Sequence, residues 1–278
     1  MINTKKVLTV ALSLAFINWG CVSITDNAAT KFSLESLKLT AHTVTGYWLE
    51  EDLFNDDKQA WSGTASVIDK KDDMLLLVTN CHVLGLKSLS EADNATDSES
   101  DIKDYQLQVC FASGKKARVL AFGTHNNLDL AVLVVKADSL VEGEDYVMIH
   151  PSENSQVKVG DNVVAVGSPK GFVGTHTFGR ISAVYNKTTD NSCRVFQTDA
   201  AINHGNSGGP LFIEQHGAFK WIGVNTWRID NADNLGFAID ANELIDSKNW
   251  DMNVYPTNPK GAASALFKLF GMKAVVIK

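Results

Sequence analysis

The chain has 278 residues, which is enough for one large or two small domains with a substantial core. Hydrophobic residues make up 45% of it and charged residues 21%, proportions that are ordinary for a globular protein. The formal net charge of −7 argues against a nucleic-acid partner, because proteins of that class carry a basic stripe or patch.

Residues 1–23 are typical of an export signal. Two lysines precede an apolar run at 7–17 that is too short to span a membrane comfortably. Two kinds of processing are compatible with this segment: cleavage near Ser23, or lipidation of Cys21. Gly20-Cys21 resembles the end of a bacterial lipobox, although the two residues before it depart from the usual pattern. A buried N-terminal helix is the structural alternative.

The polar segment 24–41 is interpreted as an N-terminal arm, and residues 42–150 as a first β-barrel. The β-branched and aromatic residues that favour strands concentrate in three stretches, at 43–48, 61–68 and 74–78. The second and third are joined by a turn rich in Asp and Lys, which predicts a hairpin that ends just before His82.

Residues 87–104 are acidic and rich in serine, which favours a solvated loop. The alternative is a lid or partner-contact loop beside His82. Apolar and polar residues then alternate from Tyr105 to Phe111, the pattern of a half-buried strand. Two further strands are expected at 117–122 and just after Asp129, up to Val135.

The polar stretch 136–158 is expected to link the first barrel to a second, at 151–240. The strands of the second barrel are expected at 163–166, 175–184, 195–198, 211–213, 220–227 and 235–239. Short, regularly spaced strands with almost no helical periodicity indicate an all-β sandwich or barrel. Residues 241–278 are predicted to form a helical tail, whose last helix packs on the domain or, alternatively, lies on a membrane surface.

Ser207 lies in a glycine-rich run at 201–210. A serine hydroxyl becomes a good nucleophile when a neighbouring base takes its proton, and attack on a carbonyl needs donors aimed at the oxyanion. Gly205 suits the second task, because a residue without Cβ lets its N–H approach a substrate. The alternative interpretation is an ordinary turn between two strands.

His82 and Asp129 are the candidate partners of Ser207. His82 follows the apolar run 74–78, so a rigid strand would place it at the edge of a cleft. Asp129 comes directly before another apolar strand and is expected to accept the second ring N–H of His82.

These segments resemble the trypsin-like serine proteases of the HtrA/DegP type. The residues that carry the resemblance are Thr-Asn-Cys-His-Val at 79–83, Asp-Leu-Ala-Val at 129–132, the run at 198–210 and Gly-Phe-Ala-Ile at 236–239. It covers about residues 60 to 240 and implies an all-β fold: two six-stranded antiparallel β-barrels with the active site in the cleft between them. The segment after Asp240 is too short for the PDZ domain that many relatives carry there.

The resemblance also implies a mechanism, with His82, Asp129 and Ser207 as the catalytic triad. The backbone N–H groups of Gly205 and Ser207 would form the oxyanion hole. An extended substrate would add as a strand along residues 224–227, by β-augmentation. The expected substrate-binding residues are Ala201, Ile202, Val224, Asn225, Thr226 and Trp227. Because Ala201 and Ile202 offer no acid to receive Lys or Arg, a preference for small or medium aliphatic residues is expected.

Apart from Cys21, the cysteines are Cys81, Cys110 and Cys193, which permit at most one internal disulfide and leave an odd thiol. A Cys81–His82 nucleophile pair is disfavoured, because adjacent residues on a strand point to opposite faces. The histidines show no ligand spacing of a metal site, and no cofactor is expected.

The function expected from these residues is that of a serine endopeptidase acting on exported, misfolded or extended polypeptides. The alternative is a protease homologue that binds polypeptides without cutting them. An esterase is disfavoured, because Ser207 lacks the Gly-x-Ser-x-Gly elbow. We expect an exported protein, in the periplasm as a soluble form or a tethered lipoprotein, or secreted. The expected partners are polypeptides and further copies of the chain, with a membrane only if Cys21 is lipidated.

Overall fold

The computed structural model describes residues 32–52, 55–85, 102–125, 127–152, 156–187, 193–228, 234–244, 252–253 and 274–275. The expected export signal, Cys21 and most of the acidic segment 87–104 lie outside these ranges. Among the residues so described, no helix is long and apolar enough to cross a membrane.

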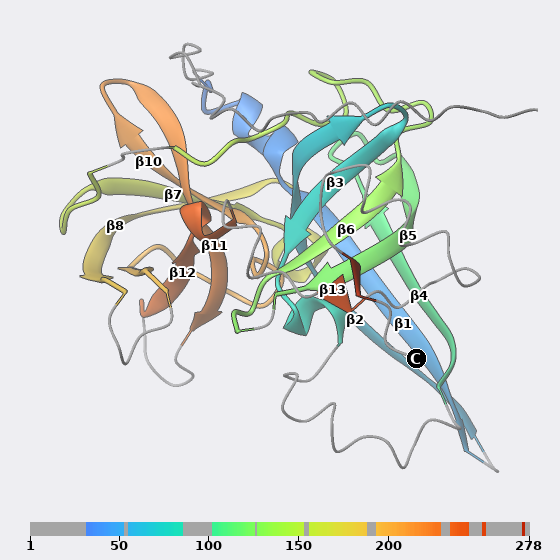
Figure 1. The fold of residues 1–278 in the computed structure, drawn as a ribbon. Coiled ribbons are helices and arrows are strands. Elements are labelled where there is room, and N and C mark those ends of the chain that lie inside the picture. Colours follow the sequence, from blue (N-terminus) through green and yellow to red (C-terminus); the bar gives the residue numbers. More distant parts are fainter. Residues whose placement is uncertain are drawn as a thin grey trace, which may run out of the picture. The chain divides into compact units, whose positions relative to one another are not determined.

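Six antiparallel strands close the first barrel in the order β1-β2-β3-β6-β5-β4 (Figure 1). They are β1 (His42–Asp52), β2 (Asn55–Lys71), β3 (Met74–Thr79), β4 (Ile102–Cys110), β5 (Lys116–Thr124) and β6 (Ala131–Lys136). The strand β4 begins at Ile102, inside the segment expected to be a loop, so this part of the prediction was wrong.

Six more antiparallel strands close the second barrel in the order β10-β11-β12-β9-β8-β7. They are β7 (Asn162–Gly167), β8 (Thr175–Tyr185), β9 (Val195–Thr198), β10 (Pro210–Gln215), β11 (Ala218–Arg228) and β12 (Gly236–Asp240). The predicted all-β fold of two six-stranded barrels is confirmed.

The strand β3 is apolar along its whole length because both of its faces are buried. Leu75 and Leu77 pack in the core of the first barrel, whereas Leu76 and Val78 join an apolar cluster that also holds Phe212 of the second barrel. The strand β6 divides its residues between the same two clusters. Full burial of one such side chain is worth about 2 kcal/mol, so the two strands that lead to His82 and follow Asp129 are firmly held.

The N-terminal arm packs on the second barrel. Phe32 forms an isolated bridge with Phe219, and its ring lies 5.8 Å from that of Phe212. A 3-10 helix, η1 (Ser36–Thr40), follows, with Leu37 fully buried.

The segment expected to link the barrels is in large part built into the first one. Tyr146 is fully buried in the core of the first barrel, and Ile149 N–H donates to the Val67 carbonyl of β2 at 3.0 Å. Between them, Val147 N–H donates to the Leu39 carbonyl of the N-terminal arm at 2.8 Å. Residues 137–149 therefore cover the first barrel, and only the following residues lead to the second.

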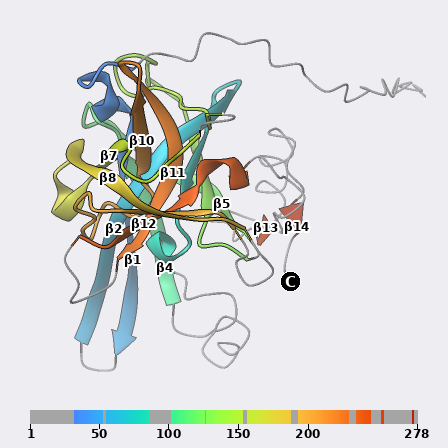
Figure 2. The same ribbon diagram turned by 90° about the vertical axis from the view of Figure 1, so that its left-hand side faces the viewer.

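Two short pieces represent the predicted helical tail. The first is a 3-10 turn, η4 (Ala241–Leu244), at the end of β12. The second is a parallel pair of two-residue strands, β13 (Met252–Asn253) and β14 (Ala274–Val275), which lie side by side in Figure 2. The helices predicted for the rest of the tail fall outside the described residues.

Candidate active site

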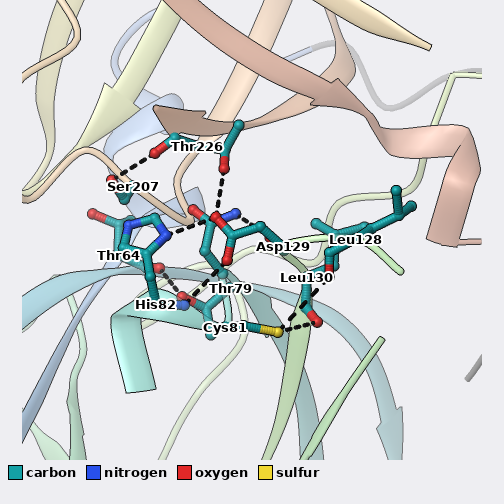
Figure 3. Close-up of polar contacts among 10 residues, drawn as sticks. Thr64, Thr79, Cys81, His82, Leu128, Asp129, Leu130, Ser207 and Thr226 are labelled. Carbon is teal, nitrogen blue, oxygen red and sulfur yellow. Dashed lines mark hydrogen bonds and ion pairs between the residues drawn. The ribbon is translucent and has the colours of Figure 1, made fainter. Parts of the chain in front are cut away.

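His82 and Asp129 are joined by two hydrogen bonds at the end of β3. The strand β3 ends at Thr79, and the 3-10 helix η2 (His82–Leu84) begins three residues later at His82. The ring Nδ1 lies 2.6 Å from Oδ2 of Asp129, and the backbone N–H of His82 donates to Oδ1 at 3.1 Å (Figure 3). Both carboxylate oxygens thus contact the same residue, which fixes the imidazole ring and leaves Nε2 as its available nitrogen.

Asp129 is also held from both barrels. Oγ1 of Thr226, on β11, donates to Oδ2 at 2.7 Å, and Nδ2 of Asn80 donates to the Asp129 carbonyl at 2.6 Å. The carboxylate consequently bridges a histidine of the first barrel and a threonine of the second.

Two opposing effects set the pKa of Asp129. Burial acts to raise it, whereas the hydrogen bond and charge of His82, followed by the Thr226 hydroxyl and the His82 backbone N–H, act to lower it. The lowering effects win, so the pKa lies below the usual value for an aspartate. Asp129 is therefore ionised at neutral pH and can stabilise a positive charge on His82.

Ser207 is linked to these groups through Thr226, which contacts the serine with its backbone carbonyl and Asp129 with its hydroxyl. Its Oγ donates to the Thr226 carbonyl at 3.0 Å, while the Thr226 hydroxyl contacts Asp129, which contacts His82 (Figure 3). Among the described residues Ser207 Oγ makes no hydrogen bond to His82. The structure thus brings the three predicted residues into one site, with the serine hydroxyl turned toward β11.

The loop that carries Ser207 is fixed by both barrels. From β2, Thr64 N–H donates to the Ser207 carbonyl at 2.8 Å, and Thr64 Oγ1 donates to the Gly205 carbonyl at 2.6 Å. From β11, the Asn225 carbonyl accepts the Gly208 N–H at 2.8 Å. These bonds hold the backbone on both sides of the nucleophile.

The loop also presents two unused backbone donors. Asn206 N–H donates to the Asn203 carbonyl at 2.9 Å, which closes a turn in which Gly205, the third residue, has φ +100°. A positive φ at this position is what a type II turn requires and what glycine adopts without strain. Within the described part of the chain, the N–H groups of Gly205 and Ser207 have no acceptor. Donors of this kind suit an incoming oxyanion.

The predicted substrate-binding residues divide into two groups. Val224 pairs with Pro210 on one side and Ile239 on the other, and Asn225 exchanges hydrogen bonds with the loop of Ser207. The backbones of these two residues have no free edge, so strand addition by a substrate is left to the residues that follow them, and a part of Val224 and Asn225 in substrate binding stays a prediction. The sequence could not show that β10 and β12 cover the strand this far.

Of the other four predicted residues, Trp227 and Ala201 are exposed, whereas Ile202 and Thr226 are buried. Trp227 is 42% exposed, and its ring stacks on Phe237 at 5.5 Å. Ala201 is exposed, whereas Ile202 is buried so close to Gly236 that a Cβ added at Gly236 would overlap its Cγ1 atom. The Ile202 side chain therefore fills the space next to Gly236.

Cys81 is a free thiol, as is Cys110. Burial, and then the neighbouring Asp129 carboxylate, raise the pKa of Cys81 to about 12. Its Sγ donates to the Leu130 carbonyl at 2.9 Å. Such a thiol is neutral and poorly nucleophilic at physiological pH. In the described ranges, no group of three or more metal-ligating side chains occurs.

Sequence reasoning missed two residues that organise the site. Asn80 donates to the Asp129 carbonyl. The sequence did offer a signal for it, because Asn80 lies between the apolar strand and His82. Thr64 gave none, because a threonine in a strand is common and its partner Gly205 lies 141 residues further along the chain.

Comparison with known proteins shows the family of this chain. A family model described as a trypsin-like peptidase domain matches residues 63–224. The serine protease Do-like HtrA of Bacillus subtilis is 29% identical over 68% of this chain and 39% of its own length. The Lactobacillus helveticus protein of the same name is 31% identical over 71% of this chain and 47% of its own length. A probable periplasmic serine endoprotease, DegP-like, from Hahella chejuensis is 46% identical over 46% of this chain and 26% of its own length.

Solved structures share the fold. An HtrA-type protease, AlgW, solved with a tripeptide superimposes with a TM-score of 0.54 at 23% identity, over 78% of this chain and 62% of that one. The serine endoprotease from Yersinia pestis gives a TM-score of 0.51 at 26% identity, over 78% of this chain and 65% of that one. The chain spans less than half the length of the curated relatives named above. It belongs to the trypsin-like peptidase family, and its relatives there are serine proteases of the HtrA/DegP type.

Proposed function

We propose that this protein is a serine endopeptidase in which Ser207 is the nucleophile, His82 the general base and Asp129 the group that orients His82. The observation that carries the proposal is the contact of 2.6 Å between His82 Nδ1 and Asp129 Oδ2, beside Thr226, whose hydroxyl contacts Asp129 and whose carbonyl accepts from Ser207. That arrangement leaves His82 Nε2 available for a proton from the serine, as acyl transfer requires.

The reaction begins with a rotation of the Ser207 side chain. Its Oγ leaves the Thr226 carbonyl and turns toward Nε2 of His82, whose side chain is 48% exposed and open to substrate. As Oγ attacks the peptide carbonyl, His82 takes its proton and Asp129 stabilises the imidazolium. The proton then passes to the leaving amine, and water hydrolyses the acyl-enzyme by the same steps.

The N–H groups of Gly205 and Ser207 receive the oxyanion. Because neither is used within the described fold, they need no rearrangement to act. One such donor is worth about 3 kcal/mol of transition-state stabilisation.

The substrate pairs as an extended strand with the end of β11, at Thr226–Arg228. Ile202 fills the space beside Gly236, and no carboxylate is present at Ala201 or Ile202 to receive a basic side chain. We therefore expect cleavage after small or medium aliphatic residues. A peptide library in which the protein cuts mainly after Lys would contradict this specificity without affecting the proposed triad.

The proposed setting is the cell envelope. The chain starts with a segment typical of an export signal, and a relative from Hahella chejuensis is named as a probable periplasmic endoprotease. Its substrates would be exported polypeptides that are misfolded or extended. Mass spectrometry of the mature N-terminus tests the setting: a lipid on Cys21 or a start near Ser23 supports export, and an intact residue 1 contradicts it.

Labelling of Ser207 by a fluorophosphonate tests the activity, with casein cleavage as the second readout. We expect the wild type to be labelled and to cut casein, Ser207→Ala to do neither, and His82→Ala to be slowed by several orders of magnitude.

The rival function is polypeptide binding without cleavage, which the Ser207–Thr226 hydrogen bond favours, since it turns the nucleophile away from His82. If the folded, processed wild-type protein is not labelled by the fluorophosphonate and does not cut casein, the function is polypeptide binding without cleavage.

A further inference from the structure

The backbone that carries Asp129 depends on a buried histidine that the proposed mechanism does not use. His125 follows the last residue of β5 and is only 3% exposed. Its ring Nδ1 accepts two backbone hydrogen bonds, from the N–H of Asn127 and the N–H of Leu128, each at 3.1 Å. The imidazole must therefore be neutral, with its proton on Nε2, because a protonated Nδ1 cannot accept.

This contact is of a kind that Asp and Asn side chains usually make. In an Asx turn their side-chain oxygen accepts the backbone N–H two residues further on and so mimics a backbone turn. In this chain a histidine nitrogen takes that position for residues 127 and 128. The imidazole therefore holds the backbone of the loop at residues 127 and 128.

The loop so held ends on Asp129. Leu130 N–H donates to the Leu128 carbonyl at 2.7 Å, a three-residue turn with Asp129 at its centre. His125 N–H donates to the Leu130 carbonyl at 2.8 Å. Cys81 Sγ donates to the same oxygen at 2.9 Å, as Figure 3 shows. The residues on both sides of Asp129 are thus hydrogen-bonded to His125, one through its side chain and one through its backbone.

We infer that His125 is a positioning residue for this site: its Nδ1 holds Leu128, and with it the carboxylate of Asp129, at the distance that His82 requires. The inference rests on the proposed function for its effect on catalysis, but the contact between His82 and Asp129 can be observed without catalysis. Loss of the acceptor leaves the N–H groups of exposed Asn127 and half-buried Leu128 without the partner that now fixes them, so the loop loses its hold on the residue before Asp129.

The test compares two substitutions that differ in one property. His125→Leu fills the buried site but cannot accept a hydrogen bond, whereas His125→Asn can accept both N–H groups from the Asx-turn position. Thr40→Val is the matched control, since it also deletes a buried side-chain hydrogen bond, 2.7 Å to the Leu37 carbonyl, but in η1. We measure kcat and KM on a peptide substrate, and the low-field NMR resonance of the His82 Nδ1 proton.

We expect His125→Leu to lower kcat by about tenfold or more while KM changes less than twofold, since a small misplacement of a reacting group is costly. His125→Asn is expected to stay within about threefold of the wild type, because it restores the acceptor. The His82 proton resonance is expected to broaden or shift in His125→Leu only. Thr40→Val is expected to keep both kcat and the resonance.

Two results would overturn the inference: a kcat and resonance in His125→Leu equal to those of the wild type, or a loss in His125→Asn as deep as in His125→Leu. If His125→Leu does not fold, His125→Gln replaces it, since its longer side chain misses the Asx-turn position; equal kcat for Gln and Asn then refutes the role. If the wild type itself cuts nothing, the proposed function fails. The resonance, recorded in a Ser207→Ala background, still decides for or against His125.

Discussion

The stability of this protein is expected to fall in mild acid because of one buried histidine, His42. It opens β1, is fully buried, and packs against Phe111 with ring centroids 4.7 Å apart. Neither ring nitrogen has a hydrogen-bond partner among the described residues. Burial lowers the pKa of His42 to about 3, against a smaller opposing effect of the Asp145 carboxylate. The folded protein therefore keeps this imidazole neutral.

The direction of the pH effect follows from the two states. The unfolded chain binds a proton at His42 near pH 6.5, whereas the folded chain does so only near pH 3. The stabilisation is complete above pH 6.5 and is lost as the pH falls from there toward 3. At about 1.4 kcal/mol per pH unit, the folded state loses about 2.5 kcal/mol between pH 7 and pH 4.5 through this residue alone.

Urea unfolding at pH 7 and pH 4.5 measures the effect, in a Ser207→Ala background that excludes self-cleavage. The comparison protein adds His42→Leu, which has a similar volume and no charge. At pH 7 we expect it to be at least as stable as the background, because two unpaired nitrogens are removed. Between the two pH values the background is expected to lose about 2.5 kcal/mol more than the His42→Leu protein. Other acid-sensitive groups, such as Asp129, contribute equally to both proteins.

An equal loss of stability in the two proteins would refute this reasoning. It would mean that His42 binds its proton equally well in the folded and unfolded states, and so that the site is hydrated or open. The reasoning also fails if the His42→Leu protein is several kcal/mol less stable than the background at pH 7. That loss would mean that the His42 ring nitrogens do have a polar partner in the folded protein.

Three further substitutions or treatments test the site. Thr226→Val removes the hydroxyl that donates to Asp129. It is expected to lower kcat about tenfold with unchanged KM, because a hydrogen bond to a charged group is worth about 1.5 kcal/mol. An unchanged kcat would contradict this expectation. Gly208→Ala forces a Cβ into the backbone and side chain behind it at φ +84°, whereas Gly217→Ala has φ +73° but open space, so Gly208→Ala is expected to lower the melting temperature far more. Equal shifts would show that φ alone decides. Cys81, with its pKa raised to about 12, is expected to resist iodoacetamide at pH 8 in the native protein and react after unfolding, as mass spectrometry would show; rapid native alkylation refutes it.

The strands of both barrels could be predicted largely from local pattern. The alternation from Tyr105 to Phe111 predicted β4, and the continuous apolar run at 74–78 predicted β3. Periodicity alone does not distinguish a run of the second kind from a buried helix. Its short length and the turn residues before it favoured a strand, and the structure explains the absence of alternation by burial on both faces.

The hairpin of β1 and β2 shows where local pattern stops being informative. Strands were expected to end at residue 48 and resume at 61, but backbone pairing continues to Asp52 and Asn55. The residues in between are rich in Asp and Glu, which are depleted in strands. Once the register is set by the apolar parts of the strands, pairing extends into a segment whose own composition does not favour it.

The sequence predicted the residues of the candidate site that have a chemical role of their own, but not the residues that hold them in place. Ser207, His82 and Asp129 are uncommon in their local contexts, so motif reasoning found them. The groups that hold them together are threonines and backbone atoms whose partners lie 97 and 141 residues away, as for Thr226 with Asp129 and Thr64 with Gly205. Both bonds cross from one barrel to the other, so they exist only when the barrels are docked. Assembly of the site is therefore coupled to docking, and a substitution that weakens the apolar cluster shared by the barrels would impair the triad without touching any of its members.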